Sequence, residues 1–203
     1  MKELSLHILD IAQNSLLSEA TLIVISLTEN RDTLEVSVSD NGCGIKREFL
    51  KHVSTPHFTT RKAKNGGMGL ALFRQAAEKT GGSFSIESKC ASEYSQNREL
   101  HGTLVRAVFY KSSPEYVPLG DIVPTLICII QALNQNANLL FSHIFKVLDK
   151  SEKSESGKKA FLLDTRDIRS ELGDISLSEP EILMWLKEYL NEKYNNIISK
   201  VRN

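Results

Sequence analysis

Three short segments, taken in their order along the chain, constrain the fold more than any other feature of this sequence. The first is a helical segment that carries Asp10 and Asn14 one turn apart, and the second is a strand that runs into Asp40–Gly44. The third is the glycine-rich run Gly66–Leu70 at the start of another helix. Glycine lets the backbone approach a ligand closely, and a helix N-terminus offers unpaired N–H groups to an anion. Together the segments predict a site for a phosphate-bearing ligand.

The periodicity of apolar residues predicts an α+β fold. Helices are expected over residues 4–18, 46–53, 70–80 and 121–133, and from a capping box at 178–181 through residue 190; strands are expected over 22–28, 33–39, 83–88, 102–110, 139–148 and 160–164. A break near Lys111 divides the chain into a first unit, residues 1–111, and a small α/β extension, residues 112–203. We expect the extension to pack on the sheet of the first unit or to continue it.

The side chains around the glycines suggest which phosphate compound would bind. Asp40, at a strand end, can accept a hydrogen bond from an exocyclic amine such as that of adenine. Gly42 and Gly44 leave room for a flat ring, and Lys62 brings positive charge to the loop before the second helix. Asn14 supplies a carbonyl oxygen, a hard ligand suited to Mg²⁺. These groups predict a site for ATP with magnesium.

The same segments resemble the GHKL superfamily, which contains DNA gyrase B, the heat-shock chaperone ATPases, MutL and the histidine kinases. Residues 10–14 look like its N box, 40–45 like its first glycine box, 56–62 like the P-F-F-T-T-K run of many histidine kinases, and 67–70 like its second glycine box. The resemblance covers about residues 1–110. It implies a Bergerat fold, an α/β sandwich with a mixed, largely antiparallel sheet and helices on one face.

The resemblance also implies which residues bind the nucleotide. These are Asn14, which also holds the metal, and Asp40, Gly42, Gly44, Thr60, Lys62, Gly67, Met68, Gly69 and Leu70. Asp10 occupies the position where gyrase-like ATPases have a water-activating Glu and histidine kinases commonly have an Asn near the magnesium. It is therefore a candidate catalytic base, or else a metal or water contact. His7 shares this helix face and is a candidate for the γ-phosphate side, although a structural role is more usual for such a histidine.

The resemblance leads us to expect Mg²⁺-dependent ATP binding by a protein that phosphorylates or regulates a separate protein. Only nine residues precede Asp10, so we expect the phosphoacceptor to lie on that partner. Two alternatives remain: a non-catalytic switch whose ATP-bound form creates a surface for a partner, and a slow ATPase. A homodimer is left open.

Composition indicates which classes of partner and which cellular compartment to expect. Lys and Arg (25) balance Asp and Glu (25), so bulk charge predicts neither nucleic acid nor a membrane as a partner. Three scattered cysteines and the lack of an apolar leader favour a reducing, cytoplasmic setting. Among these cysteines, Cys43 is expected to be a small buried side chain. Trp185 and Tyr189, at helical spacing, are expected to belong to the core.

Overall fold

Six strands form one continuous sheet in the computed structural model, which describes residues 2–55, 68–91, 101–146 and 158–202. The strand order is β3-β4-β2-β1-β5-β6. The strands are β1 (Leu22–Glu29), β2 (Thr33–Asp40), β3 (Ser83–Lys89), β4 (Gly102–Tyr110), β5 (Asn138–Lys146) and β6 (Lys158–Asp164). All neighbours are antiparallel except β1 and β5, which are parallel. The expected mixed, largely antiparallel sheet is confirmed.

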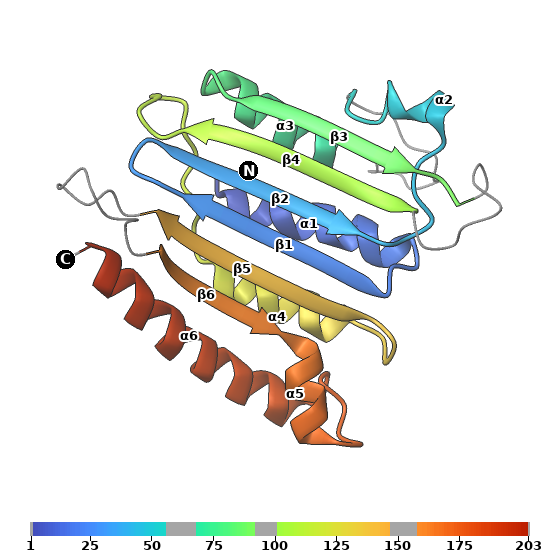
Figure 1. The fold of residues 1–203 in the computed structure, drawn as a ribbon, viewed down its shortest axis with the longest axis vertical. Helices are drawn as coiled ribbons and strands as arrows, with labels where there is room; N and C mark the ends of the chain where they lie inside the picture. The colour runs from blue at the N-terminus through green and yellow to red at the C-terminus, as the bar shows by residue number, and fades with distance from the viewer. Residues whose placement is uncertain (1, 56–67, 92–100, 147–157, 203) are drawn as a thin grey trace.

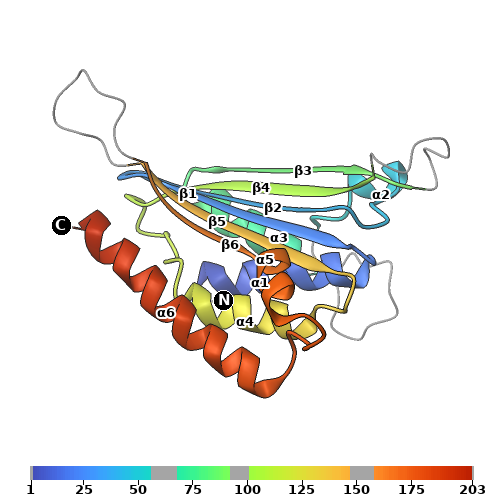
Figure 2. The same ribbon diagram turned by 60° about the horizontal axis from the view of Figure 1, so that its bottom comes forward.

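Helices α1, α3 and α4 cover one face of this sheet, as Figures 1 and 2 show. The described helices are α1 (Leu4–Leu17), α2 (Arg47–Leu50), α3 (Gly69–Lys79), α4 (Ile122–Ala132), α5 (Thr165–Leu172) and α6 (Pro180–Arg202). α6 runs beside β6 at one edge of the sheet, and α2 lies near the other edge. Among the helices of these ranges, none combines the length and the apolar character needed to cross a bilayer.

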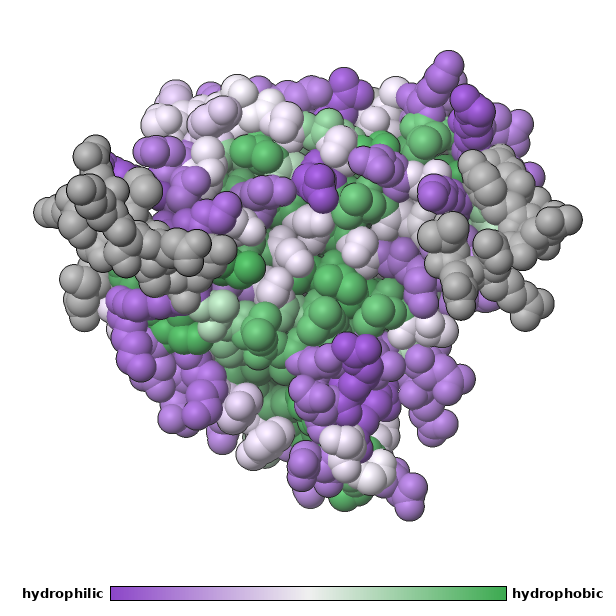
Figure 3. Space-filling view, in the orientation of Figure 1, coloured by the Kyte–Doolittle hydropathy of each residue, from purple (hydrophilic) through white to green (hydrophobic). Residues whose placement is uncertain are grey.

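The core lies between the sheet and these three helices. Alternate residues of the strands point towards it, which is the period of two expected for a sheet with one covered face. The fully buried core side chains include Ile23, Ile25, Leu27, Leu34, Phe109 and Phe141 from the strands, and Leu4, Ile8, Phe73, Ile122 and Leu126 from the helices. Burying each such side chain contributes about 1.5–3 kcal/mol. The opposite face is open, and Figure 3 shows apolar side chains gathered in its lower half.

The C-terminal extension continues the sheet of the first unit. β5 pairs along β1, and β6 adds the edge strand. The extension also completes the start of α1, where the backbone N–H groups of Leu4 and Ser5 donate to the carbonyl oxygens of Pro118 and Leu119, both at 2.9 Å. Because the first N–H groups of a helix have no partner within it, these bonds replace a side-chain cap that Glu3 does not provide.

The short helix α5 is missing from the sequence-based expectation. Four of its eight residues are charged, so apolar periodicity gives little signal there. The helix begins because Asp164 caps it, accepting a hydrogen bond from the backbone N–H of Arg166 at 2.9 Å. The other expected helices and strands are present, with ends that differ by a few residues, except that α6 continues to Arg202.

A partly buried polar cluster joins the first unit to the extension at the end of β1. His143 Nε2 donates to the Glu29 carboxylate at 3.0 Å, and Lys111 Nζ donates to the same carboxylate at 2.5 Å. His143 Nδ1 lies 2.6 Å from the hydroxyl of Tyr194 on α6. Burial by itself raises the pKa of Glu29, but the hydrogen bonds from His143 and Lys111 outweigh it, so the pKa is lowered overall.

We predict that Glu29→Gln lowers the free energy of unfolding by about 1–3 kcal/mol at neutral pH, because it removes a charged acceptor from two donors. The lowered pKa means that this stabilisation is complete above the unfolded-state pKa and is lost as pH falls through the folded-state pKa. Urea unfolding of both proteins from neutral pH down to acidic pH measures the difference. Glu35→Gln is the control, since Glu35 is exposed and 3.7 Å from Arg106. A Glu29→Gln difference that did not shrink in acid would contradict this role.

Candidate functional site

Asp40 ends β2 beside the C-terminal half of α1, where two groups of the protein hold its carboxylate. The Ser15 hydroxyl donates to Oδ2 at 2.7 Å, and the backbone N–H of Gly42 donates to Oδ1 at 2.9 Å. A carboxylate oxygen can accept more than one hydrogen bond, so both oxygens keep the capacity to accept a bond from a ligand. The group is thus oriented as an acceptor for a donor such as an amine.

The glycine turn after Asp40 is closely packed against Ser18 on one side and Lys89 on the other. A Cβ on Gly42 would lie 2.0 Å from Ser18 Oγ, and one on Gly44, whose φ is +71°, would lie 2.0 Å from the carbonyl oxygen of Lys89. His101 Nδ1 donates to the Gly42 carbonyl oxygen at 2.6 Å. This turn therefore requires glycine for close packing and, at Gly44, for a left-handed backbone.

Asp10 and Asn14 lie on the side of α1 that faces α3. A Cβ on Gly69 would lie 3.3 Å from Asp10 Cβ and 3.5 Å from its Oδ2, so the first residue of α3 is in contact with this side chain. Asn14 is exposed and one turn further along α1. Neither side chain has a hydrogen bond to another described residue. Their spacing of four residues places both side chains on one side of the helix, which suits a shared hard cation.

The N-terminus of α3 is open to an anion. Its N-cap residue, Met68, is 43% exposed and makes no side-chain cap, and the first turn holds no acidic residue. Gly69 and Leu70, which follow, are half-buried. The first N–H groups of such a helix, together with its positive dipole end, favour a phosphate. The predicted contacts Thr60, Lys62 and Gly67 lie outside the described residues and stay predictions.

Two titratable groups on α1 have shifted pKa values. Burial raises the pKa of Asp10, which makes its carboxylate a stronger base than an exposed aspartate. Burial, with a smaller effect of the positive N-terminus, lowers the pKa of His7 to about 4. His7 is therefore neutral at neutral pH; it is 3% exposed, and its ring lies 5.7 Å from that of Phe73. These surroundings are those of a core histidine.

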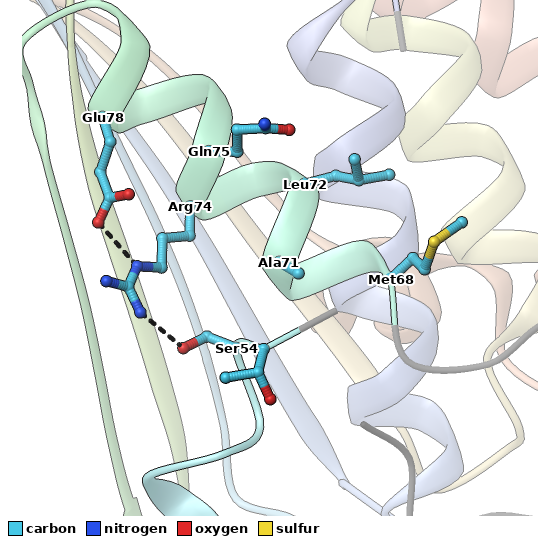
Figure 4. A pocket seen from close by; sticks show the side chains of 8 residues that line it. Ser54, Met68, Ala71, Leu72, Arg74, Gln75 and Glu78 are labelled. Carbon is cyan, nitrogen blue, oxygen red and sulfur yellow. Dashed lines mark hydrogen bonds and ion pairs between the residues drawn. The ribbon is translucent and has the colours of Figure 1, made fainter. Parts of the chain in front are cut away.

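A pocket of about 260 Å³ opens on α3, lined by Ser54, Thr55, Met68, Ala71, Leu72, Arg74, Gln75 and Glu78. Figure 4 shows Arg74 reaching towards Glu78 and Ser54, at 2.7 Å and 3.4 Å. Of the sequence-predicted site residues that the structure describes, only Met68 lines it. The pocket therefore does not represent the site that Asp40 and Asp10 outline. Nor do the described His, Cys, Asp and Glu residues form any group of three or more suited to a metal ion.

The structure adds residues to the site and corrects one expectation. Ser15, Ser18 and His101 hold Asp40 and the glycine turn, but no spacing in the sequence identifies them, because they lie 25, 24 and 59 residues from the groups they contact. Cys43 was expected to be buried and is exposed. The turn is held by its backbone, with Cys43 N–H donating to the Ser18 carbonyl oxygen, so its side chain is left outside.

Comparison with known proteins identifies this arrangement. The family described as "Histidine kinase-, DNA gyrase B-, and HSP90-like ATPase" matches residues 2–112. The chain belongs to this ATPase family. Membership implies ATP binding, and the matched range contains Asp10, Asn14, Asp40 and the start of α3. The GHKL resemblance of the sequence is thereby confirmed.

Two of the individual relatives of this chain are kinases by name. The chain is 39% identical over 84 residues to sporulation kinase D of Bacillus subtilis (strain 168), covering 40% of this chain and 16% of that protein. It is 36% identical over 67 residues to the sensor histidine kinase ZraS of Escherichia coli O157:H7, covering 33% of this chain and 14% of ZraS. The chain thus matches only a small part of each relative's length.

A solved structure resembles more of the chain. The N-terminal domain of a DNA repair protein covers 79% of this chain and is itself covered to 52%, with 16% identity and a TM-score of 0.50. This likeness concerns the fold alone. Its coverage extends beyond the 111 residues that the ATPase family matches, so part of the extension also has a counterpart in shape.

We predict unequal effects from two glycine substitutions that sequence alone treats alike. Gly44→Ala forces a left-handed alanine, which costs about 1–2 kcal/mol, and also drives a methyl group into the Lys89 backbone. Gly69→Ala costs less stability, because its backbone is not left-handed and the added methyl group meets only the Asp10 side chain, at 3.3 Å, which a small shift relieves. Thermal unfolding separates the two variants. A Gly69→Ala protein less stable than Gly44→Ala would show that the turn geometry is wrong.

Proposed function

We propose that this ATPase-family chain binds ATP with Mg²⁺ and acts on a separate protein, by phosphorylating it or by regulating it. The observation that carries the proposal is that α1 contacts both Asp40 and the start of α3. Near its C-terminal end Ser15 holds Asp40 as a hydrogen-bond acceptor, and nearer its N-terminal end Asp10 touches Gly69 at the start of α3. A ligand that carries a hydrogen-bond donor at one end and an anionic group at the other would bind Asp40 with the first and the start of α3 with the second.

The base would be selected by the acceptor character of Asp40. Adenine presents an exocyclic amine, a donor, whereas guanine presents a carbonyl oxygen at the same ring position. The carboxylate of Asp40 would accept a hydrogen bond from the adenine amine, whereas the guanine carbonyl oxygen would place two acceptors against each other with no proton between them. This argument supports ATP over GTP.

The residues that would hold magnesium are Asn14 and Asp10. Both offer oxygen atoms, they lie one helical turn apart, and neither is engaged by another described side chain. When bound, the cation would neutralise negative charge on the phosphates. The chain's own contribution is positioning: α3 presents its first N–H groups, Asp40 orients the base, and Asp10 orients a cation or a water molecule.

Slow ATP hydrolysis is a second candidate, favoured by the environment of Asp10. Its carboxylate is half-buried without a hydrogen-bond partner among the described residues, and its pKa is raised. Those are the properties of a group that can accept a proton from water. The distinction between transfer to a partner, hydrolysis and a purely regulatory switch then depends on what happens to the γ-phosphate.

Calorimetric titration with ATP, with and without Mg²⁺, tests nucleotide binding. We expect Mg²⁺-dependent binding of ATP in preference to GTP, weakened about 10- to 100-fold by Asp40→Asn, since a charged acceptor is worth about 1.5–3 kcal/mol. The control is Glu35→Gln, an exposed carboxylate of the neighbouring sheet surface. Equal affinity of the wild type and Asp40→Asn would rule out Asp40 as the base contact.

Turnover of ATP tests the role of Asp10. If Asp10 is a base, Asp10→Asn abolishes phosphate release while ATP still binds, whereas Asn14→Ala weakens Mg²⁺-dependent binding itself. Because the pKa of Asp10 is raised, wild-type turnover rises with pH through a midpoint above the usual range of an aspartate. Measuring the rate of phosphate release at a series of pH values gives this midpoint. A wild type that binds ATP without consuming it, alone or with candidate partners, would favour the switch.

A further inference from the structure

Helix α6 leaves an aromatic surface uncovered at the edge of the molecule. Its Leu186, Leu190 and Tyr194 are buried and face α4 and β6, whereas Trp185 and Tyr189 are 52% and 41% exposed. The expectation that these two belong to the core is therefore wrong. Their spacing of four residues does place them on one helix face. The buried face of a helix, however, is the one that contacts the rest of the protein, and here that is the face that carries Leu186.

The exposed rings form an ordered surface. Trp185 and Tyr189 are stacked with centroids 5.4 Å apart and an interplanar angle of 18°. Met184, the residue before Trp185, is 63% exposed, and Ile175, in the segment before the helix, is 53% exposed. Exposed large apolar side chains on a soluble protein are typical of an interaction surface when they lie together, as Trp185 and Tyr189 do. We call the exposed α6 residues on this side of the helix the α6 aromatic face; they are Glu181, Met184, Trp185, Glu188, Tyr189 and Glu192.

This face is acidic although the whole chain is neutral. Its three carboxylates, Glu181, Glu188 and Glu192, are exposed, and none forms an ion pair within the described ranges. The segment before the helix adds two further exposed carboxylates, Asp174 and Glu179. An apolar surface surrounded by unpaired negative charge is complementary to an apolar partner that carries positive charge.

Helix geometry places the charges beside the rings. At 3.6 residues per turn, Glu181, Glu188 and Glu192 lie on the same side of α6 as Trp185 and extend over about 17 Å. The surface already holds one cation, because Lys193 Nζ lies 5.6 Å from the centroid of the Tyr189 ring. An aromatic ring with carboxylates nearby is a favourable place for a Lys or Arg side chain.

We propose that the α6 aromatic face docks a basic amphipathic helix of a partner protein, about three turns long. Apolar side chains of that helix would cover Met184 and the Trp185–Tyr189 stack, and its Lys and Arg side chains would meet the carboxylates of α6. This mode of recognition, an amphipathic helix on an apolar surface, needs the partner's anchors to recur every three to four residues. Helix α6 lies beside β6, the sheet edge remote from β3 and β4, so the proposal stands independently of the nucleotide site.

A second copy of the chain is a poor occupant of this face. It would bring its own Glu181, Glu188 and Glu192 against those of the first copy, and like charges across an interface are unfavourable. The charge of the face therefore favours a basic partner over self-association.

The chain has a single tryptophan, so its fluorescence reports on the α6 aromatic face directly. The probe is a synthetic Leu/Lys amphipathic peptide of about 18 residues, or five helical turns. We expect a saturable shift of Trp185 emission to shorter wavelength, and at least a tenfold loss of affinity in about 1 M salt, where the Debye length is about 3 Å. A Leu/Glu peptide of the same pattern should produce no shift.

Charge-reversal variants show whether binding occurs at this face. In the triple variant Glu181→Lys, Glu188→Lys and Glu192→Lys, affinity for the Leu/Lys peptide should fall at least tenfold. The matched control, Asp32→Lys, Glu87→Lys and Glu115→Lys, makes the same charge change at exposed sites elsewhere and should bind as the wild type does. Circular dichroism and thermal unfolding check that both variants are folded.

Three results would overturn the proposal. The first is equal loss of peptide binding in the two triple variants, which would show a bulk-charge effect. The second is no change in Trp185 emission with either peptide. The third is an emission shift that grows with protein concentration in the absence of peptide, which would show that a second copy covers the face.

Discussion

Burial of one face of α1 against the sheet is the contact on which the site depends. Leu4, Ile8 and Ala12 are fully buried on that face, so helix geometry turns Asp10 and Asn14 outward along the side that faces α3. Ser15, also buried, is carried to the end of β2, where its hydroxyl holds Asp40. One rigid helix thus sets the separation between Asp40 and the start of α3.

The extension is part of this support. It supplies the carbonyl oxygens that complete the start of α1, and α4 packs beside α1 over the same core. A partly buried polar cluster at the C-terminal end of β1 also joins the first unit to α6; its residues are Glu29, His143 and Tyr194. A core substitution in the extension is therefore expected to alter the packing of α1, the helix that carries Asp10 and Asn14, because the extension and α1 share a close-packed core.

Much of this architecture can be predicted from the chain alone. Alternation of apolar residues predicts β1 and β2 to within one or two residues, and the Asp40–Gly44 run points to the turn that the structure shows packed against Ser18 and Lys89. Prediction is poorest where the local signal is weak or ambiguous. Helix α5 is half charged, and the spacing of Trp185 and Tyr189 identifies a shared face without saying whether that face is covered.

The sequence by itself determined which residues have the chemistry for a nucleotide site and which local segments are helical or extended, because these follow from side-chain type and from a period of two or 3.6 residues. Only the tertiary structure decided that β5 lies parallel to β1, that Ser15 meets Asp40, that Gly69 meets Asp10 and that α6 turns Trp185 outward. Each of these is a contact, or a lack of one, between residues far apart in the chain. Local periodicity carries no information about such pairs, since many packings of the same elements would satisfy it equally well.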